Sequence, residues 1–403
     1  MTTSGAGEER WKAVLRRQKI ANAKRWLAEM RQADDLVAFV TREYDNLLRA
    51  LEMTLREPDA FSLTYELIQT LYTIAFDYAD WERWTVYLNQ ALAQSKSLGR
   101  LSESARLTEH LSDIAFLARK WDDAEVLYLE SCHIYEELGE MTRFAQALTR
   151  LAAIYVEKGK VIEALAACHQ AIQIGKSEDS LLVIAHAKFN LSYIYNRTQN
   201  FTSGLTAAEE ARSLYTKLDM KKWADKAGLN ISSALHALGR LDEAEKLNLE
   251  LIERFKESKN FRGLCITKNN LGIIAFEQQN YLRAEAAWQE TLQLYSQVED
   301  PNGLASIYNN LGKVYTSLGE WQTAEEMLQQ AIQMYGSAGD LYNWTNTRDN
   351  LADLYEAQGN MDVVRQILQE TITQISQTNI RSLAHIMEFK ETMQKRLNDL
   401  TFH

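Results

Sequence analysis

Aliphatic and aromatic residues recur along most of this chain with one fixed period. Stepping by 40 from Leu271 meets an aliphatic residue every time: Leu71, Leu111, Leu151, Leu191, Ile231, Leu271, Leu311 and Leu351. Ten positions further on, every copy has a large apolar residue: Trp81, Trp121, Val161, Phe201, Leu241, Tyr281, Trp321 and Met361. Because this register never slips, the pattern predicts eight copies of one structural unit over residues 59–379.

Each copy is predicted to contain two helices. In residues 262–278, Leu264, Leu271 and Ile274 have the spacing of one helical face, and residues 281–297 form a second helical pattern. The break between the helices carries a glycine in the best copies: Gly159, Gly239, Gly319 and Gly359. Glycine at this point suits the end of a helix, where the backbone often turns left-handed. The expected fold class is therefore all-α.

Two further helical segments flank the predicted repeats. Residues 1–58 form a basic segment with 11 Lys and Arg against 9 acidic residues, and they predict helices at 8–31 and about 34–56. The basic cluster is either a solvated face of a packing helix or a docking surface for an acidic partner, a membrane or nucleic acid. Residues 380–403 predict one amphipathic helix that caps the last copy.

The pattern resembles the tetratricopeptide repeat. The resemblance rests on the leucine–glycine step at 271–272 and 311–312, the turn glycine, the alanines of the second helix, and a tyrosine four positions after the leucine at Tyr155, Tyr195, Tyr315 and Tyr355. The usual repeat has about 34 residues. The 40-residue form is similar to that of kinesin light chains, spindle-orientation adaptors, bacterial peptide sensors and the sensor arrays of signal-transduction ATPases. The resemblance implies a right-handed superhelix of eight helix-turn-helix repeats, whose first helices line a concave groove.

The residue just before the repeated leucine is the main candidate for binding. It is Thr70, His110 and Arg150 in the first three copies, and then asparagine in five successive copies: Asn190, Asn230, Asn270, Asn310 and Asn350. The resemblance implies that this position faces the groove. An asparagine amide offers a donor and an acceptor, so it can pair with a peptide backbone of any sequence. Alternatively, these amides bond to the helix of a neighbouring repeat, and the two roles are compatible.

Neighbours of the asparagines extend the predicted peptide-binding site. The full set is Asn190, Asn230, Asn270, Asn310, Asn350, Asn269, Asn309, Arg150, His186, Lys226, Lys313 and Asn346. The cations in this set could meet carboxylates of a ligand. Residues 301–380 contain three cations against nine acids, which predicts that this end of the groove prefers a basic segment.

Several classes of function are disfavoured by composition and motifs. The net charge of −11 argues against a general nucleic-acid binder. The three cysteines and seven histidines show no disulfide or metal-ligand spacing, so we expect no metal and no cofactor. No phosphate loop, dinucleotide fingerprint, His-Glu-x-x-His or Gly-x-Ser-x-Gly occurs, and we expect neither an enzyme nor a small-molecule substrate. No apolar run approaches the length of a transmembrane helix, which favours a cytoplasmic protein.

The sequence thus predicts a non-enzymatic scaffold or adaptor that binds an extended peptide or a partner helix in its groove. The alternative is a bacterial-type regulatory sensor, whose superhelix changes pitch on peptide binding and signals through the N-terminal helices. A third alternative is a phosphatase that uses a carboxamide or an acid of a helical bundle, as in some peptide-regulated bacterial relatives. The oligomeric state is left open.

Overall fold

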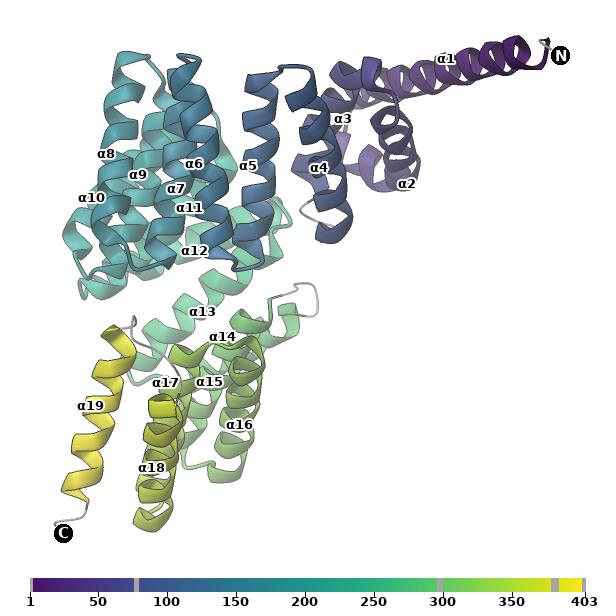
Figure 1. Ribbon diagram of the computed structural model, residues 1–403. Coiled ribbons are helices and arrows are strands. Elements are labelled where there is room, and N and C mark those ends of the chain that lie inside the picture. Colours follow the sequence, from purple (N-terminus) through teal and green to yellow (C-terminus); the bar gives the residue numbers. More distant parts are fainter. Residues whose placement is uncertain (1–2, 76–79, 296–299, 378–383, 401–403) are drawn as a thin grey trace. The chain divides into compact units, whose positions relative to one another are not determined.

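The computed structural model describes residues 3–75, 80–295, 300–377 and 384–400, and every regular element in these ranges is helical (Figure 1). The elements are α1 (Thr3–Gln32), α2 (Leu36–Leu55), the 3₁₀ turn η1 (Pro58–Ala60), α3 (Phe61–Ala75), α4 (Trp81–Ser97), α5 (Leu101–Leu117), α6 (Trp121–Glu137), α7 (Met141–Glu157), α8 (Val161–Ser177), α9 (Leu181–Arg197), α10 (Phe201–Lys217), α11 (Lys221–Ala237), α12 (Leu241–Glu257), α13 (Phe261–Glu277), α14 (Tyr281–Leu294), α15 (Pro301–Leu318), α16 (Trp321–Ala338), α17 (Leu341–Ala357), α18 (Met361–Gln377) and α19 (Ala384–Asp399).

The predicted eight helix pairs are confirmed. They run from α3 and α4 to α17 and α18, and the first helix of each pair begins one full period after that of the preceding pair throughout. The two helices predicted at 262–278 and 281–297 are α13 and α14. The all-α fold class of stacked helix pairs with helices at both ends is therefore correct.

Each described turn between helices from α4 to α14 and from α15 to α18 contains one residue with left-handed backbone. Gly159 has a φ of 72°, and the next residue donates its backbone N–H to Tyr155 O at 2.8 Å, which closes the end of α7. Arg119 adopts the same conformation with a φ of 57°, although it has a side chain. The turn is thus a property of the repeat, and glycine only lowers its cost. This explains why copies that lack the turn glycine keep the register of the repeat.

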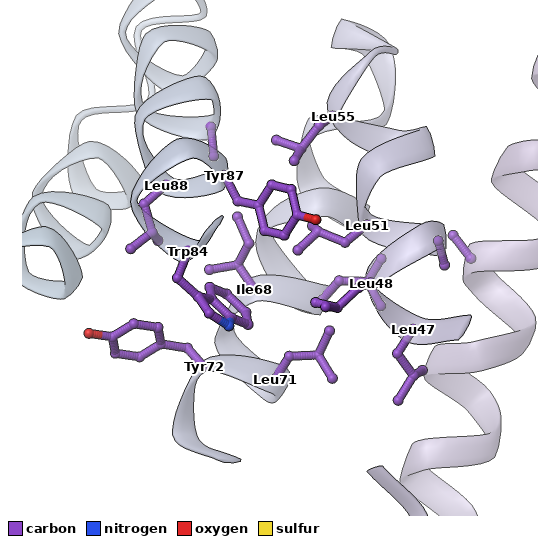
Figure 2. Packing of buried hydrophobic residues seen from close by; sticks show 14 of the residues in the cluster. Leu47, Leu48, Leu51, Leu55, Ile68, Leu71, Tyr72, Trp84, Tyr87 and Leu88 are labelled. Atoms are coloured by element: carbon purple, nitrogen blue, oxygen red, sulfur yellow. The ribbon is translucent and has the colours of Figure 1, made fainter. Parts of the chain in front are cut away.

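By its contacts, the chain divides into two compact units, residues 1–184 (unit 1) and 185–403 (unit 2). The predicted domain boundaries at 58/59 and 379/380 stay predictions. In unit 1, Leu47 and Leu51 of α2 share one core with Leu71 of α3 and Trp84 of α4, as Figure 2 shows. Trp84 stands where most other copies carry a small residue, and its Nε1 donates to Tyr44 Oη at 3.0 Å. The large side chain at this position fills the space against α2.

In unit 2, the first helices form one layer. Helix α11 contacts α13, α13 contacts α15, and α15 contacts α17. Each of these first helices also packs against the second helix of its own pair. Helix α19 extends this row, because it contacts both α17 and α18 and buries Ile386 and Met393. The predicted C-terminal cap therefore occupies the place that the first helix of another repeat would take.

The repeated leucine–glycine step is explained by packing between the two helices of a pair. A Cβ on Gly272 would lie 2.5 Å from the Trp288 indole, and a Cβ on Gly312 would lie 2.5 Å from Leu328. Both partners are almost fully buried. In these two repeats the glycine leaves room for the large residue of the second helix.

Candidate functional site

The predicted asparagine row makes hydrogen bonds between successive repeats. We call residues 70, 110, 150, 190, 230, 270, 310 and 350 the ladder position, and the residues just before them the acceptor position. Asn310 Nδ2 donates to Asn269 Oδ1 at 2.9 Å, and Asn350 Nδ2 donates to Asn309 Oδ1 at 2.8 Å. In each case the acceptor lies 41 residues earlier, on the preceding first helix. The structural alternative therefore holds for these two asparagines.

The same geometry occurs in unit 1 with other residue types. His110 Nε2 lies 3.2 Å from Gln69 Oε1, again across 41 residues. Burial lowers the pKa of His110 well below its usual value, and its Nδ1 has no hydrogen-bond partner within the described ranges. A histidine at the ladder position can thus make the same link between adjacent first helices as an asparagine.

Helix α19 supplies the last link of the row. Asp349, at the acceptor position of the eighth repeat, accepts a hydrogen bond from Arg396 Nη1 at 2.9 Å. The same guanidinium is paired with Asp353 at 2.8 Å and with Glu356. Burial and the charge of Asp353 raise the pKa of Asp349.

The preference of residues 301–380 for a basic ligand stays a prediction. Three of the nine acids counted for it, all on the first helix of the last repeat, share one cation from the cap. The count of charges within 301–380 missed this cation, because Arg396 lies outside the counted range.

The row of acceptors is interrupted in two repeats. Phe189 and Leu229 occupy the acceptor position there, and neither side chain can accept a hydrogen bond. Asn230 instead donates to Ser192 Oγ at 2.8 Å. Asn270, whose acceptor would be Leu229, makes no side-chain hydrogen bond to any residue in the described part of the chain. Both the donor and the acceptor of its amide are therefore available.

Asn270 lies between apolar side chains on α13. Ile266 and Ile273 are four positions before it and three positions after it, so all three share one helical face. Ile266 is 39% exposed, and Asn270 and Ile273 are half-buried. The side-chain oxygen of the preceding residue, Asn269, is already occupied, because it accepts hydrogen bonds from both Trp288 and Asn310. The two asparagines of the 269–270 pair thus have different roles.

Two predicted site residues of unit 2 belong to an aromatic cluster. The His186 ring packs against Trp223 with centroids 4.8 Å apart, and its Nδ1 is hydrogen-bonded to Tyr215 Oη at 2.7 Å. Lys226 Nζ lies 4.5 Å from the centre of the Trp223 ring. Cation–π contacts of this kind hold a lysine in place at a partly exposed site.

The remaining predicted residues are spread more widely. Lys313 Nζ lies 5.1 Å from the centre of the Phe276 ring on the neighbouring first helix. Asn190 and Asn346 are half-buried on α9 and α17. Arg150 belongs to unit 1, where the charge of Asp113 raises its pKa. Its acceptor-position neighbour, Glu109, bonds to Arg106 at 2.5 Å instead.

The sequence prediction did not include the acceptor position as a series. The prediction also omitted Ser192, which accepts a hydrogen bond from Asn230, and Arg396, which donates one to Asp349. The signal was present in part, because Asn269, Asn309 and Asp349 lie one period apart and are all polar.

Comparisons with known proteins agree with this architecture. Residues 263–337 match the family model of the tetratricopeptide repeat, and residues 97–262 match that of the soluble NSF attachment protein, SNAP. The chain is therefore similar to tetratricopeptide repeat proteins, and its stacked helix pairs have the all-α repeat fold of such arrays. Such an array is a helical repeat scaffold suited to protein interaction. Among curated proteins, no sequence matches this chain significantly.

Two solved structures have the same fold as most of the chain. Aspartyl phosphate phosphatase F from Bacillus subtilis is 13% identical, with a TM-score of 0.57, and the match covers 94% of this chain and 96% of that one. A signal-transduction ATPase with a tetratricopeptide repeat sensor from Pyrococcus horikoshii is 15% identical, with a TM-score of 0.56. That match covers 84% of this chain and 49% of the other. At these identities the likeness concerns the fold alone.

Two other kinds of site are absent from the described ranges. No helix there is both long enough and apolar enough to cross a membrane. The described residues also contain no group of three or more His, Cys, Asp and Glu side chains arranged around a metal position.

Proposed function

We propose that the chain is a non-enzymatic scaffold that binds an extended peptide along the first helices of unit 2, with Asn270 as the central main-chain contact. The observation that carries the proposal is the free amide of Asn270 in a row in which Asn230, Asn310 and Asn350 bond to the preceding first helix. A half-buried amide without a partner loses hydration and gains nothing in return. A peptide backbone supplies the missing donor and acceptor.

The chemistry of this contact is independent of the peptide sequence. The Asn270 Nδ2 group donates to a peptide carbonyl, while Oδ1 accepts from a peptide N–H. Its apolar neighbours Ile266 and Ile273 reduce the access of water and so strengthen both bonds. Asn310 and Asn350 use only Nδ2 for their links, and their Oδ1 atoms make no hydrogen bond within the described residues. The row therefore offers further acceptors to an extended chain.

The test is a selection of random nonapeptides, displayed on phage, against the full chain. We expect enriched peptides that bind Asn270→Ala at least tenfold more weakly than wild type, since one amide makes two bonds of about 1 kcal/mol each. The melting temperature of Asn270→Ala should not change. Asn89→Ala, on the second helix of the first repeat, is the matched control and should bind as wild type. Equal binding of the enriched peptides to Asn270→Ala would refute the proposal.

Asn310→Ala separates the structural role of the row from its binding role. This change removes the 2.9 Å bond to Asn269, and we expect the free energy of unfolding to fall by about 1 kcal/mol. If Asn270→Ala and Asn310→Ala lost the same stability, the distinction between a free and a linked asparagine would be wrong.

The regulatory sensor is the second candidate, and one feature of α1 favours it. Trp11 is 69% exposed and Leu15 is 52% exposed on the same helical face, with Arg10 and Arg17 nearby in sequence. Such a surface suits the output side of a sensor. Deleting residues 1–56 would not test this role, because Leu47 and Leu51 are part of the unit 1 core (Figure 2).

Hydrogen exchange of the intact chain gives a cleaner test of the sensor. A sensor should change the exchange rates of amides 10–31 when a selected peptide binds to unit 2. A scaffold should show protection around Asn270 alone. Trp11→Ser should leave peptide binding intact in both cases.

A further inference from the structure

The two residues that interrupt the acceptor row, Phe189 and Leu229, are apolar, and further apolar side chains on α11 and α13 are only partly buried. Phe189 packs against Trp223 with ring centroids 5.8 Å apart at 86°. Phe189, Trp223 and Leu229 are half-buried, and Ile266 on the next first helix is 39% exposed. We call these four residues the apolar subsite. They come from α9, α11 and α13, and all four belong to unit 2.

We propose that the apolar subsite binds one large aliphatic or aromatic side chain of an acidic peptide, next to the main-chain contact at Asn270. This inference rests on the proposed function and specifies its ligand. Leu229 stands at the acceptor position for Asn270, so it leaves that amide free and adds apolar surface next to it. Phe189 adds apolar surface on the preceding first helix. A peptide can then bond its main chain to the Asn270 amide and place an apolar side chain on the neighbouring apolar surface.

The spacing of the helices fits this arrangement. Packed helix axes lie roughly 8–10 Å apart. An extended peptide advances about 3.3 Å per residue. A chain that crosses from α11 to α13 therefore places the apolar residue two or three positions away from the residue bound by Asn270. The direction of the bound peptide depends on where its acidic residues lie, because the lysines of α11 attract them.

The charges around the subsite select an acidic partner. Lys222, Lys226 and Leu229 follow one another along one face of α11. Lys222 and its neighbour Lys221 are exposed and make no ion pair within the described ranges. The acid closest in sequence is already matched, because Asp225 is paired with Arg254 at 3.1 Å. Positive charge at the edge of an apolar surface favours peptides with aspartate or glutamate beside the apolar residue.

Selection of random nonapeptides on the full chain tests the inference directly. The enriched sequences should have Leu, Ile, Phe or Met at one position, with Asp or Glu within three positions of it. Ile266→Ser keeps the amide of Asn270 free and alters an exposed side chain, so folding is not at risk. We expect it to weaken binding of an enriched peptide roughly tenfold. Ile162→Ser, at an 81% exposed site of unit 1, is the matched control and should have no effect.

Leu229→Asn tests the link between the subsite and the amide. It restores a polar acceptor for Asn270 on the preceding first helix, as at Asn269 and Asn309, and should weaken peptide binding at least as much as Ile266→Ser. Enriched peptides that depend on Asn270 but have no apolar position, or that bind Ile266→Ser as wild type, would overturn the subsite and leave the proposed function standing. Peptides insensitive to Asn270→Ala would overturn both. Self-association in sedimentation that Ile266→Ser abolishes would instead assign the subsite to a second copy of the chain.

Discussion

Gly272→Ala perturbs a contact on which one helix pair of unit 2 depends. The added Cβ would lie 2.5 Å from two atoms of the Trp288 indole, and real carbon contacts are never so close. The indole cannot easily move away, because Trp288 is 2% exposed and its Nε1 donates to Asn269 at 2.9 Å. The substitution must therefore shift α13 against α14 or break this hydrogen bond.

The expected cost follows from opposing contributions. Overpacking of a filled core costs about 1–3 kcal/mol. Loss of the indole hydrogen bond adds about 1 kcal/mol. Replacing glycine by alanine inside a helix returns roughly 0.5–1 kcal/mol. The free energy of unfolding should thus fall by about 1–3 kcal/mol. Gly336→Ala is the control, because its Cβ would meet the Trp344 ring at an ordinary 3.6 Å, and it should stabilise slightly.

Urea unfolding followed by hydrogen exchange of α13 measures the effect in unit 2, even when the two units unfold separately. A double variant refines the reasoning, because the eighth repeat naturally pairs Ala352 with Leu368. Combining Gly272→Ala with Trp288→Leu should cost less than the sum of the single changes, by about 0.5–1 kcal/mol, as expected for residues in contact. If Gly272→Ala stabilised the protein as Gly336→Ala does, the packing explanation of the leucine–glycine step would be refuted.

Three further changes test other parts of the fold. Burial lowers the pKa of His110 and keeps its side chain neutral in the folded state, so the unfolded state binds the additional proton. The free energy of unfolding should therefore fall as the pH drops below about 6.5, by up to about 1.4 kcal/mol per pH unit. Urea unfolding at pH 7.5 and 5.5 should show this loss in wild type and not in His110→Gln. Lys259 has a φ of 51°, so Lys259→Gly should raise the unfolding free energy by about 1 kcal/mol, whereas Lys246→Gly inside α12 should lower it by a similar amount in the same thermal denaturation assay. Arg396→Met leaves Asp349 beside two other acids, and we expect faster hydrogen exchange in α19 at pH 7 than in wild type. The difference should be smaller at pH 4, because burial raises the pKa of Asp349 and so favours its neutral form as the pH falls.

Much of the fold was predictable because the repeat period is a local property that recurs in eight copies. Each helix needs only its own apolar face and a turn, and a regular series such as Leu71 to Leu351 shows where that face lies. The sequence also shows which residues depart from the repeat pattern, but it does not show why they do so. Trp84 replaces a small residue because α2 packs there, and this partner lies outside the repeats.

The candidate site was less predictable, because the sequence shows which side chain is present but not what it bonds to. Asn270, Asn310 and Asn350 occupy equivalent positions and look the same in the sequence. Asn310 and Asn350 are linked to acceptors 41 residues earlier, and Asn270 is not, because Leu229 stands at its acceptor position.

The sequence by itself therefore determined the repeat, its helices, its turns and the row of asparagines, since these follow from residue spacing along one chain. Only the tertiary structure decided which asparagine is free, which glycine is required and where Arg396 lies. The physical reason is that a hydrogen bond, a close contact or an ion pair depends on two residues brought together by packing. Asn269 and Asn270 show the difference most clearly, because they are adjacent in sequence, yet the side-chain oxygen of Asn269 accepts two hydrogen bonds and the amide of Asn270 makes none within the described residues.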